Sequence, residues 1–305
     1  MLMLKKMKKT DFLPLSAREY ALYESFADPG EESCERSWAN LLLYIDSYQW
    51  YSAVLEGCLW TASFKNGYLF FPAAGSIEPE KLARRLQEFQ LLCSGNETAV
   101  CGDVPFAYIR QYPQVVDFFE VEEDPGEFDY IYDLEHLAGF AGARLRKRHN
   151  QFKQFERAYE GRYLVRNIAF DDLKHIRRFA AELSIEKWQS ESGLEEKLAF
   201  ERLESVWQEK SSGLAGVMLE VDGKLAGFSI YSPLNKKLAD IHFEKADRRY
   251  CGCGVKLTRA LVEELLNKGF RQMNREQDLN IEGLRRAKQA LDPEYFYRRF
   301  TLKLR

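Results

Sequence analysis

The sequence contains no run of 18 consecutive apolar residues, so we predict no membrane-spanning helix. Four lysines lie among the first nine residues, but no apolar segment follows them. This pattern predicts no secretory signal, and we expect a cytoplasmic protein. Only 9 of the 305 residues are proline, while 46% are apolar and 30% are charged. Such a composition is typical of a folded chain and excludes extended disorder and a collagen-like structure.

Metal-binding motifs are also missing from the sequence. Neither the cysteines nor the histidines show the spacing of a zinc site, and the only close cysteine pair is separated by a single glycine. We therefore predict no metal site, and we expect the cysteines to be reduced, largely buried thiols. The cysteines stand at positions 34, 58, 93, 101, 251 and 253, and the histidines at 136, 149, 175 and 242.

Charge is distributed unevenly along the chain, although the net charge is only −3. Residues 1–130 hold 11 Lys+Arg and 21 Asp+Glu, whereas residues 131–305 hold 33 Lys+Arg and 26 Asp+Glu. The C-terminal part is therefore the better candidate for binding an anion, with a solvated basic surface as the alternative. The densest basic run predicts a polyanion-binding surface formed by Arg144, Arg146, Lys147 and Arg148.

The length predicts two domains, with a boundary near a basic helix expected over residues 134–160. We place the domains at residues 1–145 and 146–305. Strands alternate with helices in both halves, which predicts an α/β (α+β) fold with mixed, mostly antiparallel sheets flanked by helices. The Asn66-Gly67 and Asp222-Gly223 pairs are typical of hairpin turns.

A glycine loop, residues 249–254, separates an expected strand from an expected helix. Gly252 and Gly254 permit close approach of a ligand to the backbone, and the following helix begins with unpaired N–H groups. This combination favours a pyrophosphate, although a simple turn is the alternative. The predicted binding residues are Arg248, Arg249, Cys251, Gly252, Cys253, Gly254 and Lys256.

The loop and the strand order of residues 214–304 resemble the GNAT acyltransferase superfamily. Residues 249–254 match its Arg/Gln-x-x-Gly-x-Gly/Ala motif for coenzyme A. The resemblance implies two GNAT-like domains, acyl-coenzyme A as co-substrate, and a strand over 241–245 that splays from its neighbour to hold the acyl arm. The N-terminal half is interpreted as a degenerate copy, because its strand-to-helix turn at 71–75 lacks a basic residue.

Four stretches of the sequence, residues 130–137, 146–150, 241–247 and 274–279, carry a narrower resemblance that covers most of the chain. On these residues the chain is similar to soluble bacterial relatives of the phosphatidylglycerol lysyltransferase C-terminal domain. The membrane-bound members of that family move an aminoacyl group from tRNA to a lipid.

Three carboxylates are candidates for acid–base chemistry. Glu244 lies near the end of the central strand, where acetyltransferases of the superfamily often have a base, and Glu276 and Asp278 follow the next strand. We expect all three to face one cleft, with solvated carboxylates as the alternative. The helix expected near 281–290 lacks the tyrosine acid of many of these acetyltransferases.

Three functions remain open at this point. The first is acyl transfer from acyl-coenzyme A to an amine, which the glycine loop favours. The second is aminoacyl transfer from aminoacyl-tRNA to a lipid or peptide, which the basic run and the narrower resemblance favour. The third is a binding module that kept the fold and lost the chemistry, which the missing tyrosine favours.

Overall fold

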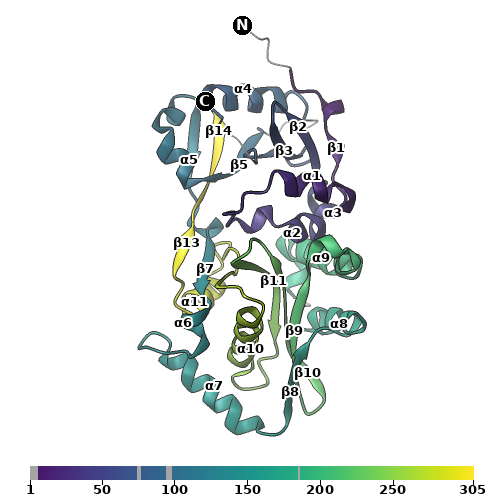
Figure 1. The fold of residues 1–305 in the computed structure, drawn as a ribbon, viewed down its shortest axis with the longest axis vertical. Helices are drawn as coiled ribbons and strands as arrows, with labels where there is room; N and C mark the ends of the chain where they lie inside the picture. The colour runs from purple at the N-terminus through teal and green to yellow at the C-terminus, as the bar shows by residue number, and fades with distance from the viewer. Residues whose placement is uncertain (1–5, 74–76, 94–97, 185) are drawn as a thin grey trace. The chain divides into compact units, whose positions relative to one another are not determined.

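The computed structural model describes residues 6–73, 77–93, 98–184 and 186–305. Contacts divide the chain into two units, and neither is continuous in sequence (Figure 1). The first comprises Met1–Glu31, Ile45–Glu127 and Arg298–Arg305, and the second comprises Glu32–Tyr44 and Phe128–Tyr297. The boundary expected between residues 145 and 146 falls inside the second unit. Ala74 and Gly75 of the turn interpreted as a degenerate loop lie outside the described residues.

A mixed seven-stranded sheet forms the centre of the first unit. Only its β4–β5 pair is parallel among the described strands. In spatial order the strands are β1 (Leu13–Pro14), β2 (Tyr51–Leu55), β3 (Cys58–Ser63), β4 (Tyr68–Phe70), β5 (Val100–Pro105), β14 (Arg299–Leu304) and β6 (Phe119–Glu122). The helices are α1 (Tyr20–Ser25), α3 (Ile45–Tyr48), α4 (Pro79–Gln90) and α5 (Phe106–Gln111). Leu82, Leu86 and Phe89 put the apolar face of α4 into the core of this unit.

The second unit is built on another mixed seven-stranded sheet. Here the β11–β12 pair is parallel and the other described pairs are antiparallel. In spatial order the strands are β13 (Tyr295–Tyr297), β7 (Asp129–Asp133), β12 (Gln272–Asn274), β11 (Leu238–Ala246), β10 (Lys224–Pro233), β9 (Ala215–Val221) and β8 (Tyr163–Asn167). Asp222 and Gly223 both adopt positive φ and close the β9–β10 hairpin, which confirms that turn.

Helices cover the sheet of the second unit. Leu257, Leu261 and Leu265 recur at helical spacing on α10, and they pack into a core that also contains residues of β9 and β10. Figure 1 shows α10 lying in front of this sheet. The helices are α2 (Trp38–Leu43), α6 (Leu134–Ala138), α7 (Arg146–Tyr159), α8 (Leu173–Leu183), α9 (Glu191–Gln208), α10 (Cys253–Asn267) and α11 (Glu282–Gln289).

The expected architecture of two mixed, mostly antiparallel sheets flanked by helices is confirmed. Two expected elements are each divided in the structure. The helix expected over 134–160 is two helices, because the chain breaks after α6 near Gly139. The last strand in the strand order of residues 214–304 is also two strands, β13 in the second sheet and β14 in the first. Among the described residues, no helix has the length and apolar composition needed to span a membrane.

Candidate active site

Strands β11 and β12 separate at one end of their pairing. They pair only from Leu238–Gln272 to Asp240–Asn274, although β11 continues to Ala246. On its other edge β11 contains a bulge at His242, where the register with β10 shifts. The strands therefore diverge beyond Asp240, as the superfamily resemblance implied for residues 241–245.

Three side chains meet where the two strands separate: Asp240 and His242 of β11, and Glu276 after β12 (the Asp–His–Glu cluster). Their ligating atoms all lie within 4.8 Å of one another. Nδ1 of His242 is 3.6 Å from Oδ2 of Asp240 and 3.7 Å from Oε1 of Glu276. The side chains of Asp240 and His242 are fully buried, whereas that of Glu276 is 22% exposed.

Hydrogen bonds fix only one side of this cluster. Nε2 of His242 lies 2.8 Å from Oγ of Ser232, and that oxygen lies 3.3 Å from Oγ of Ser37. Within the described part of the chain, Nδ1 of His242 and both carboxylate oxygens of Asp240 have no partner in hydrogen-bonding geometry. Burial first, and then the negative charge of Glu276, raise the pKa of Asp240 well above its usual value, and a weaker interaction with the Ser37 hydroxyl opposes this shift.

The backbone that carries Glu276 is strained and firmly held. Glu276 has a φ of 56°, in the left-handed region that residues other than glycine rarely adopt. Lys288 of α11 is buried, and its Nζ donates hydrogen bonds to the carbonyls of Arg275 and Gln277 on either side of Glu276. Burial lowers the pKa of Lys288 to about 8. A left-handed residue held by its surroundings is typical of functional sites.

The other two candidate carboxylates occupy different environments. Oε1 of Glu244 lies 2.5 Å from an Arg275 nitrogen, and its buried Oε2 has no hydrogen-bond partner among the described residues. Asp278 accepts hydrogen bonds from Tyr130 at 2.6 Å and from Arg285 at 2.8 Å. Burial alone would raise the pKa of Asp278, but these hydrogen bonds and that of the Asn280 amide together lower it. Asp278 therefore fixes α11 to β7. Of the three predicted carboxylates, Glu244 and Glu276 are the two that lie where β11 and β12 diverge.

The glycine loop packs against α7. Gly252 has a φ of 77°, and a Cβ atom there would lie 2.5 Å from the carbonyl oxygen of Gln151 and 3.0 Å from Cβ of Phe155. The amide of Cys251 donates to the hydroxyl of Tyr159 at 3.3 Å. Gly252 is thus required both for its backbone conformation and for the close approach of α7.

The cations predicted around the loop are largely paired within the protein. Nε and Nη2 of Arg249 both donate to Oδ2 of Asp247, at 2.8 and 2.6 Å. Nζ of Lys256 lies 2.7 Å from Glu156 of α7 and 3.1 Å from the Tyr163 hydroxyl. Arg248 is exposed.

The two loop cysteines differ in their surroundings. Cys251 is exposed, whereas Cys253 is buried and its thiol donates to the carbonyl of Ala226. Burial raises the pKa of Cys253 to about 12, so this thiol does not ionise near neutral pH.

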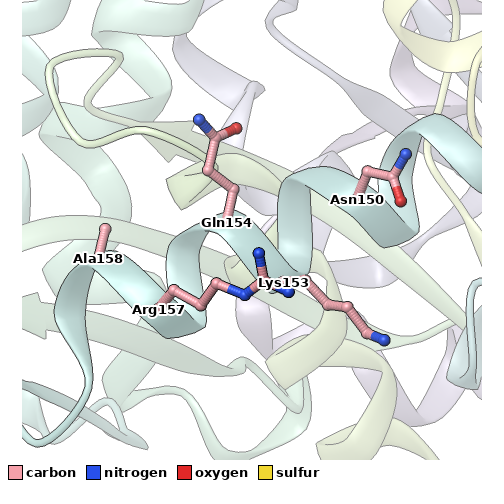
Figure 2. A pocket seen from close by; sticks show the side chains of 5 residues that line it. All are labelled: Asn150, Lys153, Gln154, Arg157 and Ala158. Carbon is pink, nitrogen blue, oxygen red and sulfur yellow. The ribbon is translucent and has the colours of Figure 1, made fainter.

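The predicted polyanion-binding residues divide into two pairs. Arg146 and Lys147 are exposed on α7. Arg144 pairs with Asp292 at 2.8 Å, and Arg148 is partly buried, with Nη1 donating to Gln151. Further along the same exposed side of α7 lie two cations that the sequence analysis did not select. Figure 2 shows them, Lys153 and Arg157, lining a pocket together with Asn150, Gln154 and Ala158.

Sequence reasoning missed Asp240, His242 and Lys288 as parts of the site. One signal was available, because alternate positions 240, 242 and 244 are ionisable within an otherwise largely apolar strand. Lys153 and Arg157 follow the basic run at helical spacing, which would have extended the predicted surface. Nothing in the sequence pattern points to Lys288.

Solved structures show the same fold. A conserved protein of unknown function from Bacteroides thetaiotaomicron VPI-5482 has a TM-score of 0.85 at 22% identity, over 96% of this chain and 99% of that one. The C-terminal domain of a putative lysylphosphatidylglycerol synthetase from Agrobacterium fabrum has a TM-score of 0.62 at 11% identity, over 94% and 92% of the chains. L-PGS from Bacillus licheniformis has a TM-score of 0.60 at 12% identity, over 95% and 92%.

The sequence comparisons place the chain in a family. No curated protein matches it. The profile described as "Phosphatidylglycerol lysyltransferase, C-terminal" matches residues 27–303, which is nearly the whole chain. The chain therefore belongs to the family of phosphatidylglycerol lysyltransferase C-terminal domains, a family of transferases with GNAT-like folds.

Proposed function

We propose that this chain transfers an aminoacyl group from aminoacyl-tRNA to a lipid or peptide acceptor. The observation that carries the proposal is the position of α7, whose inner face covers the glycine loop and whose outer face presents cations. Family membership supports the same reaction class, because the family is named for the transfer of a lysyl group to phosphatidylglycerol.

The packing of α7 argues against acyl-coenzyme A as the donor. A pyrophosphate bound in the manner expected from the motif needs free space and backbone amides at the loop. Here the Gln151 carbonyl lies beside Gly252, and the Tyr159 hydroxyl accepts the Cys251 amide hydrogen. A carbonyl oxygen repels a phosphate, and Arg249 and Lys256 are already paired with carboxylates. Binding coenzyme A would therefore require α7 to move away.

The outer side of α7 has the character of an RNA-binding surface. Arg146, Lys147, Lys153 and Arg157 are all exposed, and Asn150 and Gln154 lie among them. Cations spaced along a helix neutralise successive phosphates, and side-chain amides add hydrogen bonds to the backbone of a nucleic acid. This arrangement supports tRNA, rather than a small co-substrate, as the carrier of the donor group.

The chemical step is proposed to take place where β11 and β12 diverge. The acceptor oxygen or nitrogen attacks the ester carbonyl of the aminoacyl group and loses its proton to Oε2 of Glu244, the oxygen that Arg275 does not hold. The tetrahedral intermediate then expels the ribose oxygen of the tRNA, which takes the proton that Glu244 accepted, so the ribose hydroxyl leaves and the carboxylate is regenerated. The ester C–O bond breaks as the new ester or amide bond forms, so no other co-reactant is needed.

A transfer assay tests this proposal. The full chain is incubated with tRNA carrying labelled amino acids or, in parallel, with labelled acetyl-coenzyme A. Phosphatidylglycerol vesicles and an amine-bearing peptide are supplied as acceptors. We expect label to move from tRNA only, and Glu244→Gln to slow the transfer by about 100-fold or more. Glu220→Gln is the matched control, because Glu220 is also a strand carboxylate paired with an arginine and is exposed to a similar degree. Transfer from acetyl-coenzyme A alone would refute the proposal.

A further inference from the structure

We propose that Asp240, His242 and Glu276 form a binding site for one divalent transition-metal cation. Each contributes one ligand atom, and these atoms lie within 4.8 Å of one another. Neither the family nor the proposed transfer reaction assigns a cation to these residues. The test of the site does not depend on tRNA, so either proposal can fail without the other.

When the Asp240 carboxyl is ionised and Nδ1 of His242 carries no hydrogen, the three groups present only hydrogen-bond acceptors to one another. The Ser232 hydroxyl engages Nε2 of His242, and when Nε2 carries the hydrogen the lone pair of Nδ1 points toward the carboxylates. The oxygens of Asp240 and Nδ1 of His242 are buried and have no partner among the described residues. Buried acceptors that face one another without a donor are costly, and a cation between them removes that cost.

The spacing of the ligand atoms also fits a metal ion. Four ligands placed tetrahedrally at about 2.1 Å from a metal lie about 3.4 Å apart. The observed separations of 3.6 and 3.7 Å are close to this value. A direct hydrogen bond would bring the atoms to about 2.9 Å. Acceptors around an ammonium group at hydrogen-bond distance would lie about 4.6 Å apart. These two separations, both from Nδ1 of His242, thus favour a metal ion over a shared proton or an organic amine.

Neighbouring groups hold the ligands in position. The Ser232 hydroxyl orients the His242 ring, which is the usual role of a group behind a metal-binding histidine. Lys288 holds the carbonyls on both sides of Glu276, whose strained backbone conformation is thereby maintained. Glu276 is the one ligand of the three whose side chain is exposed, so water can approach the cluster from its side.

The ligand set indicates which cations fit. One imidazole and two carboxylates suit zinc, iron or manganese better than magnesium or calcium, which prefer oxygen alone. No spacing motif predicted the site, because two ligands lie on β11 and the third follows β12, after the whole of α10. Only the parallel pairing of the two strands brings them together.

Metal titration of the chelator-treated full chain tests the site. Calorimetry with Zn²⁺ and electron paramagnetic resonance with Mn²⁺ measure the stoichiometry and the affinity, and thermal unfolding measures the accompanying stabilisation. We expect one saturable site per chain in the wild type. We expect Glu276→Gln, which keeps the shape of a partly exposed side chain, to weaken binding by about 100-fold or more. Asp240→Asn is expected to act in the same direction.

Two control variants distinguish metal binding at this site from binding by a neighbouring carboxylate and from binding by an exposed thiol. Glu244→Gln removes a neighbouring carboxylate of the same strand and is expected to leave metal affinity unchanged. Cys251→Ser removes an exposed thiol that could bind zinc, and it is expected to have no effect. The proposal is overturned if the folded wild type binds no metal saturably, or if Glu276→Gln binds as tightly as the wild type. Stabilisation by lysinamide without stabilisation by metal would assign the cluster to an organic cation instead.

Discussion

Lys288 is a buried cation whose hydrogen bonds hold the loop that carries Glu276. Its amine can donate to both carbonyls in the neutral form as well, because a neutral amine keeps two hydrogens. Burial lowers its pKa to about 8, so folding favours the neutral form over the charged one. The contribution of Lys288 to stability is therefore predicted to depend on pH.

The sign of this dependence follows from proton linkage. Between about pH 8 and about 10.4 the unfolded chain binds more protons at Lys288 than the folded chain, so the free energy of unfolding rises with pH. We predict that the wild type gains about 3 kcal/mol relative to Lys288→Met across this window. Denaturant unfolding of both proteins at several pH values measures the difference. If the difference in the free energy of unfolding between the two proteins does not change with pH, folding does not lower the pKa of Lys288.

The backbone strain at Glu276 leads to a second prediction. Glu276→Ala and Glu276→Gly both remove the carboxylate, but only glycine adopts a φ of 56° without strain. We expect the glycine variant to be more stable than the alanine variant by about 1 kcal/mol in urea unfolding. The same pair at Arg286, an exposed position within α11, is expected to show the opposite order. Equal stability of the two Glu276 variants would contradict the strain.

At the residue scale, sequence reasoning located part of the site. Glu244 near the end of the central strand and Glu276 after the next strand were both predicted site residues, and both lie beside the divergence of β11 and β12. Asp278 was predicted from its place after the same strand as Glu276, but it is bound to Tyr130, which lies 148 positions earlier in the chain. No local pattern reveals such a partner. His242 drew attention only as one of four histidines without zinc spacing, but its Nδ1 lacks a hydrogen-bond partner within the described chain.

At the scale of elements, the packing of the glycine loop against α7 is open to a direct test. Gly252→Ala introduces both an unfavourable φ and a collision with the Gln151 carbonyl, so we expect a loss of about 3 kcal/mol or more. Gly223→Ala is the matched control, because Gly223 has a φ of 72° but no atom within 4 Å of its added Cβ. A loss of about 1 kcal/mol is expected there.

Hydrogen exchange locates the effect of the Gly252 substitution. We expect amides of α7 to exchange faster in Gly252→Ala and at the wild-type rate in Gly223→Ala. Equal losses of stability in the two variants, with α7 unaffected in both, would show that α7 does not rest on the loop.

The glycine loop and α7 show which structural features a sequence motif predicts and which it does not. The glycines, the helix after them and the basic run were all evident in the sequence. The motif alone indicated a pyrophosphate. That α7 lies against the loop depends on the fit of Gln151 and Phe155 around Gly252, which is a tertiary contact across about 100 residues of sequence.

At the scale of the whole molecule, the fold class could be predicted but the path of the chain could not. The alternation of strands and helices and the superfamily resemblance implied two mixed sheets, and both are present. The last strand pattern divides at Arg298, so that β13 completes one sheet and β14 is inserted between β5 and β6 of the other. Neither the spacing of apolar residues nor strand propensity specifies which sheet a strand joins, because the strands of both sheets offer the same backbone hydrogen bonds.

The charge of the whole molecule supports the proposed donor. Residues 131–305 carry the excess of positive charge, and α7 belongs to that part of the chain. A concentrated basic surface raises the association rate with a polyanion and makes the affinity depend on salt. The excess of negative charge in residues 1–130 disfavours the binding of RNA phosphates there. We therefore predict that tRNA contacts the second unit through α7.

The most direct test of this account is the affinity of the full chain for tRNA at several salt concentrations. The wild type is compared with Lys153→Glu/Arg157→Glu on α7 and with Lys174→Glu/Arg178→Glu on α8, a pair with the same spacing and exposure. We predict that wild-type affinity falls steeply with salt. The α7 variant is expected to bind tRNA weakly. The slope of its salt dependence is expected to be smaller by about 1 for each phosphate that it no longer binds. The α8 variant is expected to bind as the wild type does. Equal affinities of all three proteins, or binding that does not depend on salt, would contradict α7 as the donor-binding surface.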